Sequence, residues 1–68
     1  MRPSREAARA LEAFEAALAE AATTPVPRER WAALRRSLWA LRARIGDNSL
    51  GKRLADRGRI AWLRERLG

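Results

Sequence analysis

The sequence predicts an all-α fold, a small helical bundle. Two long stretches carry apolar residues at alternating steps of three and four, the spacing of an amphipathic helix. Two prolines within three residues separate these stretches, so neither helix can continue into the other. No strand is predicted. We expect residues 1–68 to form one domain, an N-terminal antiparallel helical hairpin followed by one broken or two short C-terminal helices.

The first helix is expected over about residues 4–22. Ser4 offers an N-cap, Glu6 places an acidic side chain in the first turn, and alanine, the best helix former, fills much of the segment. The helix should stop at residues 23–27, which contain Pro25 and Pro27. Its apolar seam consists of Ala7, Leu11, Phe14, Leu18 and Ala21.

The second helix is expected over about residues 27–45, ending at Gly46, a residue type typical of C-terminal caps. Because the connection to the first helix is short, the two should pair as an antiparallel hairpin. Glu15 flanks the first seam while Arg35 and Arg42 flank the second, and these opposite charges favour the pairing by at most ~1 kcal/mol for each pair. The second seam consists of Trp31, Leu34, Leu38, Leu41 and Ile45.

The last helical segment, about residues 49–67, follows a polar turn in which Asp47, Asn48 and Ser49 offer N-caps. On one straight helix it would carry two apolar stripes with a row of arginines between them. Because a core face does not contain such a row, the sequence predicts a break near Gly58. The first stripe is Leu50, Leu54 and Ala61, the second is Ile60, Leu63 and Leu67, and the row is Arg53, Arg57 and Arg64.

Charge is distributed unevenly along the chain. Residues 1–22 have a net charge of −1, whereas residues 23–68 have a net charge of +8. This segregation predicts an acidic scaffold helix and a cationic remainder that faces a negatively charged partner. Arginine outnumbers lysine fourteen to one, which suits phosphate and carboxylate partners alike.

The composition argues against an enzyme. The chain lacks His, Cys, Tyr and Gln and has a single lysine, so each nucleophile candidate lacks a base. Glu12 and Glu15 are spaced to share a cation, but such pairs are usually the solvated face of a helix. We therefore expect no catalytic residue, no metal and no cofactor. With no secretory signal and no apolar run of ~20 residues, a soluble cytoplasmic protein is expected.

The sequence disfavours an ordinary helix-turn-helix over residues 49–68. Aligning Gly58 with the turn glycine leaves Leu54 at a position that requires a small residue, and puts arginines at apolar positions. Shifting the alignment by one places Glu65 at a core position.

Tryptophan and arginine are neighbours at two places. Trp39 lies among Arg35, Arg36 and Arg42 at helical spacing, and Trp62 lies near Arg59 and Arg66. One interpretation is a stacking platform for unpaired bases. The other, which we favour, is that Ala32, Trp39 and Ala43 form a second narrow stripe covered by a third helix. Trp31, on the main seam, is expected in the core.

Two binding functions follow from these patterns. The first is nucleic-acid binding, mostly to phosphates; the alternative is an adaptor or inhibitor that docks on an acidic protein. A membrane surface ranks third. Because alanine supplies much of the apolar content, a homodimer or a subunit of a complex is expected. The residues expected to bind are Arg28, Arg35, Arg36, Trp39, Arg42, Lys52, Arg53, Arg57, Arg59, Trp62 and Arg64.

Overall fold

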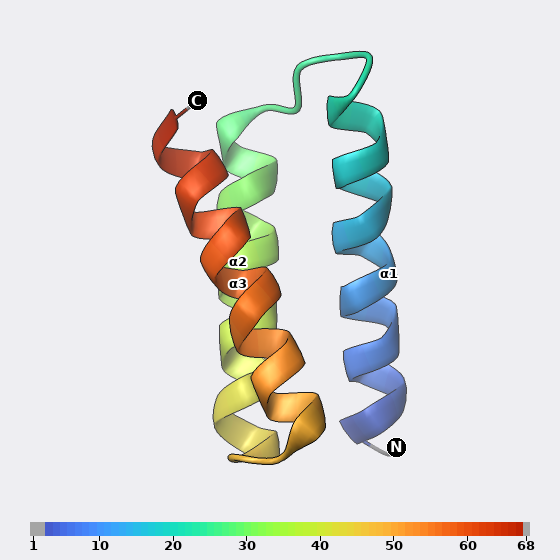
Figure 1. Ribbon diagram of the computed structural model, residues 1–68, viewed down its shortest axis with the longest axis vertical. Coiled ribbons are helices and arrows are strands. Elements are labelled where there is room, and N and C mark those ends of the chain that lie inside the picture. Colours follow the sequence, from blue (N-terminus) through green and yellow to red (C-terminus); the bar gives the residue numbers. More distant parts are fainter. Residues whose placement is uncertain (1–2, 68) are drawn as a thin grey trace.

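Three helices in up-down-up order form the structure, a computed structural model that describes residues 3–67 and the side chains of residues 5–67 (Figure 1). They are α1 (Pro3–Ala21), α2 (Arg28–Ile45) and α3 (Ser49–Leu67). Each helix runs antiparallel to the one before it, and α3 packs most extensively on α2. The all-α prediction is confirmed for residues 3–67. The N-cap predicted at Ser4 lies outside the described side chains.

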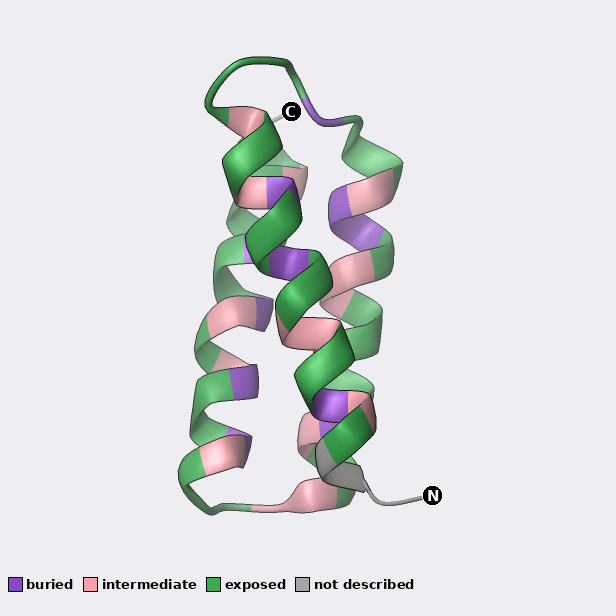
Figure 2. Cartoon of the chain, turned by 90° about the vertical axis from the view of Figure 1, so that its right-hand side faces the viewer, coloured by how far each residue is buried: buried purple, intermediate pink, exposed green. Residues whose placement is uncertain are grey.

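Each helix contributes one large, fully buried side chain to a shared core: Phe14, Leu38 and Leu54. The ring of Phe14 meets that of Trp31 edge-on, with centroids 6.2 Å apart, so Trp31 is a core residue as predicted. In Figure 2, buried positions recur along every helix between exposed ones. Every residue of the two predicted seams is buried or half-buried, and Ala17 joins them.

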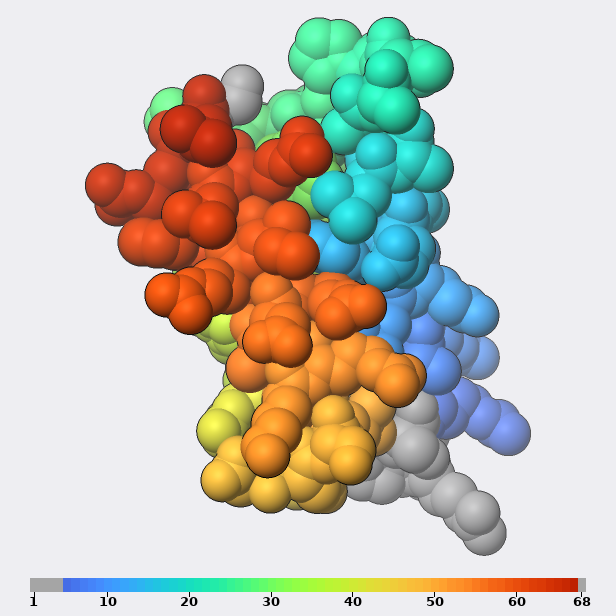
Figure 3. Space-filling model, in the orientation of Figure 1, coloured from blue at the N-terminus to red at the C-terminus, as the bar shows by residue number. Residues whose placement is uncertain are grey.

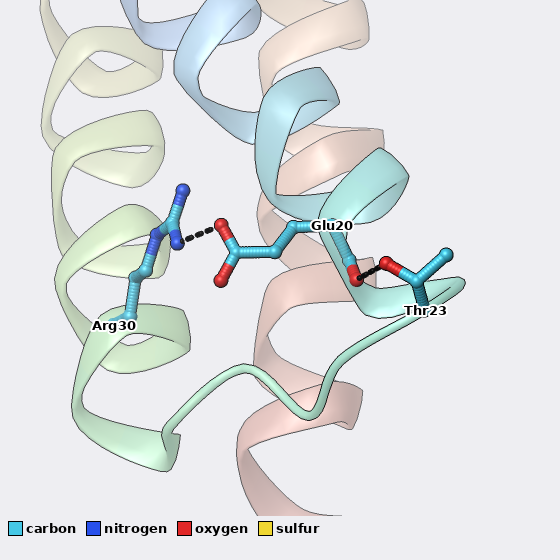
Figure 4. A network of polar contacts seen from close by, with 3 residues as sticks. All are labelled: Glu20, Thr23 and Arg30. Atoms are coloured by element: carbon cyan, nitrogen blue, oxygen red, sulfur yellow. Dashed lines mark hydrogen bonds and ion pairs between the residues drawn. The ribbon is translucent and has the colours of Figure 1, made fainter.

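The connection between α1 and α2 is anchored by Glu20, as Figure 4 shows. The hydroxyl of Thr23 donates a hydrogen bond to the backbone oxygen of Glu20, 3.2 Å away, and closes the last turn of α1. The Glu20 carboxylate also accepts a 2.6 Å hydrogen bond from Arg30 of α2. Between the two prolines, Val26 turns inward and is buried. The proline segment therefore ends α1, as predicted, and Glu20 holds the two helices together beside it.

The turn between α2 and α3 depends on two glycines and one asparagine. Gly46 has a φ of 93°, which favours glycine, and its backbone N–H donates to the carbonyl of Arg42, confirming the predicted cap. Of the candidate N-caps, Asn48 accepts a 2.9 Å hydrogen bond from the backbone N–H of Gly51. A Cβ at Gly51 would overlap the carbonyl oxygen of Gly46. The turn is tight enough that only glycine fits there.

The predicted break near Gly58 is wrong, because α3 continues through this residue without interruption. Gly58 is buried, and a Cβ there would overlap the indole ring of Trp39. Glycine inside a helix costs about 1 kcal/mol relative to alanine. Here the missing side chain lets α2 and α3 approach closely. Gly58 is therefore a packing residue. The favoured interpretation of Ala32, Trp39 and Ala43 as a stripe covered by the third helix holds only in part: Ala32 is buried and Trp39 packs on Gly58, whereas Ala43 is exposed.

Only one of the two stripes on α3 faces the core. Leu54 and Ala61 are buried, and Gly51 and Gly58 lie on the same inward face. The second stripe is exposed to solvent. The row of arginines between the stripes therefore does not enter the core, and the reason for expecting a break disappears. The exposed stripe consists of Ile60, Leu63 and Leu67.

The charge pairing predicted for the hairpin is also wrong in its partners. Glu15 lies 3.8 Å from Arg57 of α3 and is not paired with Arg35 or Arg42. Arg35 pairs with Glu65 of α3, and Arg42 pairs with Asp47 in the turn between α2 and α3. A pattern along one helix shows that a charge flanks a seam, but not which neighbouring helix lies on that side. The observed pairs are Arg35–Glu65, Arg42–Asp47, Arg30–Glu20 and Arg44–Glu6, the last two joining α1 to α2.

Candidate binding surface on α3

The large apolar side chains exposed within residues 5–67 gather on the second half of α3 and on α2 beside it. Ile60, Leu63 and Leu67 recur at steps of three and four, so they share one helix face. Their exposure is 38%, 45% and 84%. We call these three residues the aliphatic stripe. Contiguous exposed apolar side chains mark an interaction site more often than scattered ones do.

A hollow of about 390 Å³ lies between α2 and α3, next to the aliphatic stripe. The indole of Trp39 is packed on Gly58 at the bundle side, yet 39% of the residue remains exposed. We call this space the tryptophan hollow. It is lined by Trp39, Ala55, Asp56, Arg59 and Trp62.

Guanidinium groups already lie over both tryptophan rings of the hollow. The Cζ of Arg35 is 5.5 Å from the ring centroid of Trp39, and that of Arg66 is 4.9 Å from the ring of Trp62. These cation–π contacts occupy ring surface that a stacked base would need. Each ring is therefore partly covered by a guanidinium group, and the ring surface that remains exposed can be covered by an apolar side chain from outside.

Cations lie on both sides of the helix face that carries the aliphatic stripe: Arg59, Arg64 and Arg66 lie beside the stripe, and Lys52 and Arg53 lie about two turns before it. At 100° per residue, Lys52, Arg59 and Arg66 fall on the side toward α2, while Arg53 and Arg64 fall on the side toward α1. None of these five forms an ion pair with another described side chain. Asp56 is the one acidic residue on this outward face. The stripe, the hollow and the five cations together are called the α3 surface. In Figure 3, α3 (orange to red) lies across the front of the molecule.

The structure divides the predicted binding residues into three groups. Arg35, Arg42 and Arg57 are held in ion pairs with Glu65, Asp47 and Glu15. Arg28 and Arg36 lie on α2, where Arg28 adjoins Glu65 and Arg66 at the far end of the bundle. The α3 surface brings together the remaining six: Trp39, Lys52, Arg53, Arg59, Trp62 and Arg64.

Sequence reasoning missed the aliphatic stripe as part of the site. The spacing of its residues is visible in the sequence, but the break predicted near Gly58 assigns them to a short separate helix, and none of the three is in the predicted binding set. Arg66 is a helical neighbour of Trp62 in the sequence but is not one of the predicted binding residues. Asp56 and Ala55 carry no signal of their own, because only the packing of α2 on α3 places them at the hollow.

The pair between Arg35 and Glu65 joins α2 to α3 behind the α3 surface. Arg35 donates through Nε to one carboxylate oxygen at 2.6 Å and through Nη2 to the other at 3.4 Å. This hydrogen bonding lowers the pKa of Glu65, and the positive charges of Arg35, Arg36 and Arg28 lower it further, while partial desolvation acts in the opposite direction. Glu65 therefore serves the packing of the bundle and leaves the outward face cationic.

Within residues 3–67, no three His, Cys, Asp or Glu residues come together as a metal site. No helix of this part of the chain is long and apolar enough to cross a membrane. Comparisons with known protein families, curated proteins and solved structures each found no match for this chain.

Proposed function

We propose that this chain is a non-enzymatic binding protein that docks its α3 surface on an acidic protein, as an adaptor or an inhibitor. The observation that carries the proposal is the aliphatic stripe, exposed between two flanks of cations on one helix face. The cations favour any anionic partner. The stripe favours a partner that can cover aliphatic side chains, which a protein does better than a phosphate backbone.

The energetic argument is one of apolar burial. Covering a fully exposed leucine or isoleucine is worth roughly 1.5–3 kcal/mol, and the stripe residues retain between 38% and 84% of their exposure. Exposed arginine contacts contribute more to orientation and association rate than to affinity. A protein interface would therefore obtain its affinity from the stripe and its selectivity for acidic partners from the flanks.

Affinity capture from the cells that make this protein, with matched variants, tests the proposal. Wild type should recover an acidic protein in fixed stoichiometry at moderate salt. Leu63→Asp should lose it, because a charge would replace the middle of the stripe. Ala33→Asp, which adds the same charge at an exposed site of α2, is the control and should retain it. Equal recovery by wild type and Leu63→Asp, or recovery of nucleic acid in place of protein, would overturn the proposal.

Nucleic-acid binding is the second candidate, favoured by the five cations of the α3 surface that lack ion-pair partners among the described side chains. If ~6 phosphates of duplex DNA are neutralised, log affinity should fall with log salt at a slope near −5. Fluorescence anisotropy on DNA and RNA over a salt series measures this slope. A slope shallower than about −2 on both rules the candidate out.

A further inference from the structure

Resting on the proposed function, we infer that the partner presents an amphipathic α-helix with acidic flanks, which lies along α3 and places one large apolar side chain in the tryptophan hollow. The spacing of the stripe points to a helix. Ile60, Leu63 and Leu67 follow the steps of three and four that pack against a second helix by interlocking side chains.

The dimensions of the stripe agree with this occupant. From Ile60 to Leu67 is seven residues, or about 10 Å along a helix axis at 1.5 Å per residue. That corresponds to two turns of a partner helix, enough for two or three apolar side chains to lie against the stripe. The docked helix would become the fourth helix of the bundle.

The cations on the α3 surface favour an acidic partner helix over a second copy of this chain. Both flanks of the stripe are cationic, and Asp56 alone opposes five cations. Two copies joined through the stripe would bring Arg59, Arg64 and Arg66 of each copy together across one small interface, which is repulsive. A helix with glutamate or aspartate beside its apolar seam would instead meet Arg59 and Arg66 on one side and Arg53 and Arg64 on the other.

The hollow provides the place for an anchor. It is lined by Trp39 and Trp62 together with Ala55, Asp56 and Arg59, and Asp56 lies on the helix face that carries the stripe. A leucine or phenylalanine entering it would cover ring surface that is now exposed. Large apolar side chains seated in such pockets carry much of the energy of protein interfaces.

The experiment uses the full chain and three synthetic peptides of about 18 residues, long enough to form helix on binding. The first has leucines at alternating steps of three and four with glutamates on both sides. The second has the same composition in scrambled order, which preserves charge and removes the seam. The third retains the seam and replaces glutamate by lysine. Calorimetry should show binding of the first at least about tenfold tighter than of the second, and none of the third.

Variants locate the site. Ile60→Ala with Leu63→Ala should weaken the first peptide by about tenfold or more, because its seam loses its contact surface. Ala55→Leu should weaken it similarly by filling the hollow while leaving the stripe intact. Ala33→Asp should have no effect. In ¹⁵N spectra of the full chain, shifts should concentrate in residues 52–67 and in the indole N–H signals of Trp39 and Trp62.

Other outcomes overturn the inference. Equal binding of the scrambled peptide would mean that charge alone is recognised. Self-association that Leu63→Asp abolishes would make a second copy the occupant. Binding of vesicles of anionic lipid or of single-stranded DNA, sensitive to the same variants when the first peptide does not bind, would assign the surface to those partners. If the peptides fail while Leu63-dependent capture of an acidic protein persists, the helical-partner inference fails and the proposed function stands.

Discussion

Several residues of this protein are explained by contacts with residues of another helix, which their neighbours in the sequence do not reveal. Gly58 sits in the middle of a helix, where glycine is unfavourable, because Trp39 packs on its Cα. Glu65 sits among arginines and pairs with Arg35 of another helix. In each case the residue contacts a side chain that is distant in the sequence and adjacent in the structure.

Gly58→Ala should destabilise the fold by about 1 kcal/mol, despite the better helix propensity of alanine, because the added methyl displaces the Trp39 ring. Chemical denaturation measures the change. In a Trp39→Ala background the same substitution should become neutral or stabilising, by up to about 1 kcal/mol. Stabilisation by Gly58→Ala in the wild-type background would contradict the packing described for this glycine.

Glu65→Gln should remove a pH-dependent part of the stability. Because the folded state lowers the pKa of Glu65 below its ordinary 4.5, the pair with Arg35 contributes stability that is fully present above that pH. This contribution is lost as pH falls through the lowered pKa. The difference in unfolding free energy between wild type and Glu65→Gln should therefore be constant above about pH 5 and shrink toward pH 2. Glu12→Gln, at an exposed position on α1, is the control. A difference between wild type and Glu65→Gln that does not change with pH would contradict the stabilising pair of Glu65 with Arg35.

Local residues determine where the three helices begin and end, whereas the packing of neighbouring helices determines which face of each helix is buried. Pro25 and Pro27 separate α1 from α2, while Gly46 and Asn48 separate α2 from α3. The inward stripe of α3 includes two glycines, so this helix approaches the turn and α2 more closely than a leucine-rich face would allow. Its outward stripe is left without a partner in the described part of the chain.

Asn48→Ala should cost about 1 kcal/mol of folding stability, because the backbone N–H of Gly51 loses its side-chain acceptor at the start of α3. Thermal and urea unfolding both report this loss. Ser49→Ala is the neighbouring control and should change stability by less than about 0.5 kcal/mol. If the two variants were equally destabilised, the cap would have to be assigned to Ser49 or shared with it.

At the scale of the whole molecule, α1 accounts for the uneven charge of the chain. Its Glu6, Glu15 and Glu20 pair with Arg44, Arg57 and Arg30 of the other two helices. The acidic helix therefore neutralises arginines of α2 and α3, and the cations of the α3 surface remain without an ion-pair partner among the described side chains. These three pairs are formed by the helix that the sequence predicts as an acidic scaffold; that the remaining cations face a partner stays a prediction.

The core is small, so a single large side chain carries much of the stability. Phe14→Ala should cost about 3–5 kcal/mol, because the ring is fully buried against Trp31. That loss is comparable with the whole stability expected of a small domain, and the cooperative thermal transition should disappear or shift strongly downward. Leu67→Ala, at an 84% exposed position, should unfold within about 0.5 kcal/mol of wild type. A large effect of Leu67→Ala would mean that the stripe supports the fold and is not free for a partner.

The sequence by itself determined the helical class, the two seams of the hairpin, the proline connection, the Gly46 cap and the burial of Trp31. These features depend on backbone chemistry and on the periodicity of apolar residues along one segment, and both can be read directly from the sequence. Only the tertiary structure decided that α3 is continuous, that Gly58 receives Trp39, that Arg35 pairs with Glu65, and that the second stripe faces outward. The reason is physical: periodicity defines the faces of a helix, whereas the rotation and closeness of its neighbours decide which face is covered.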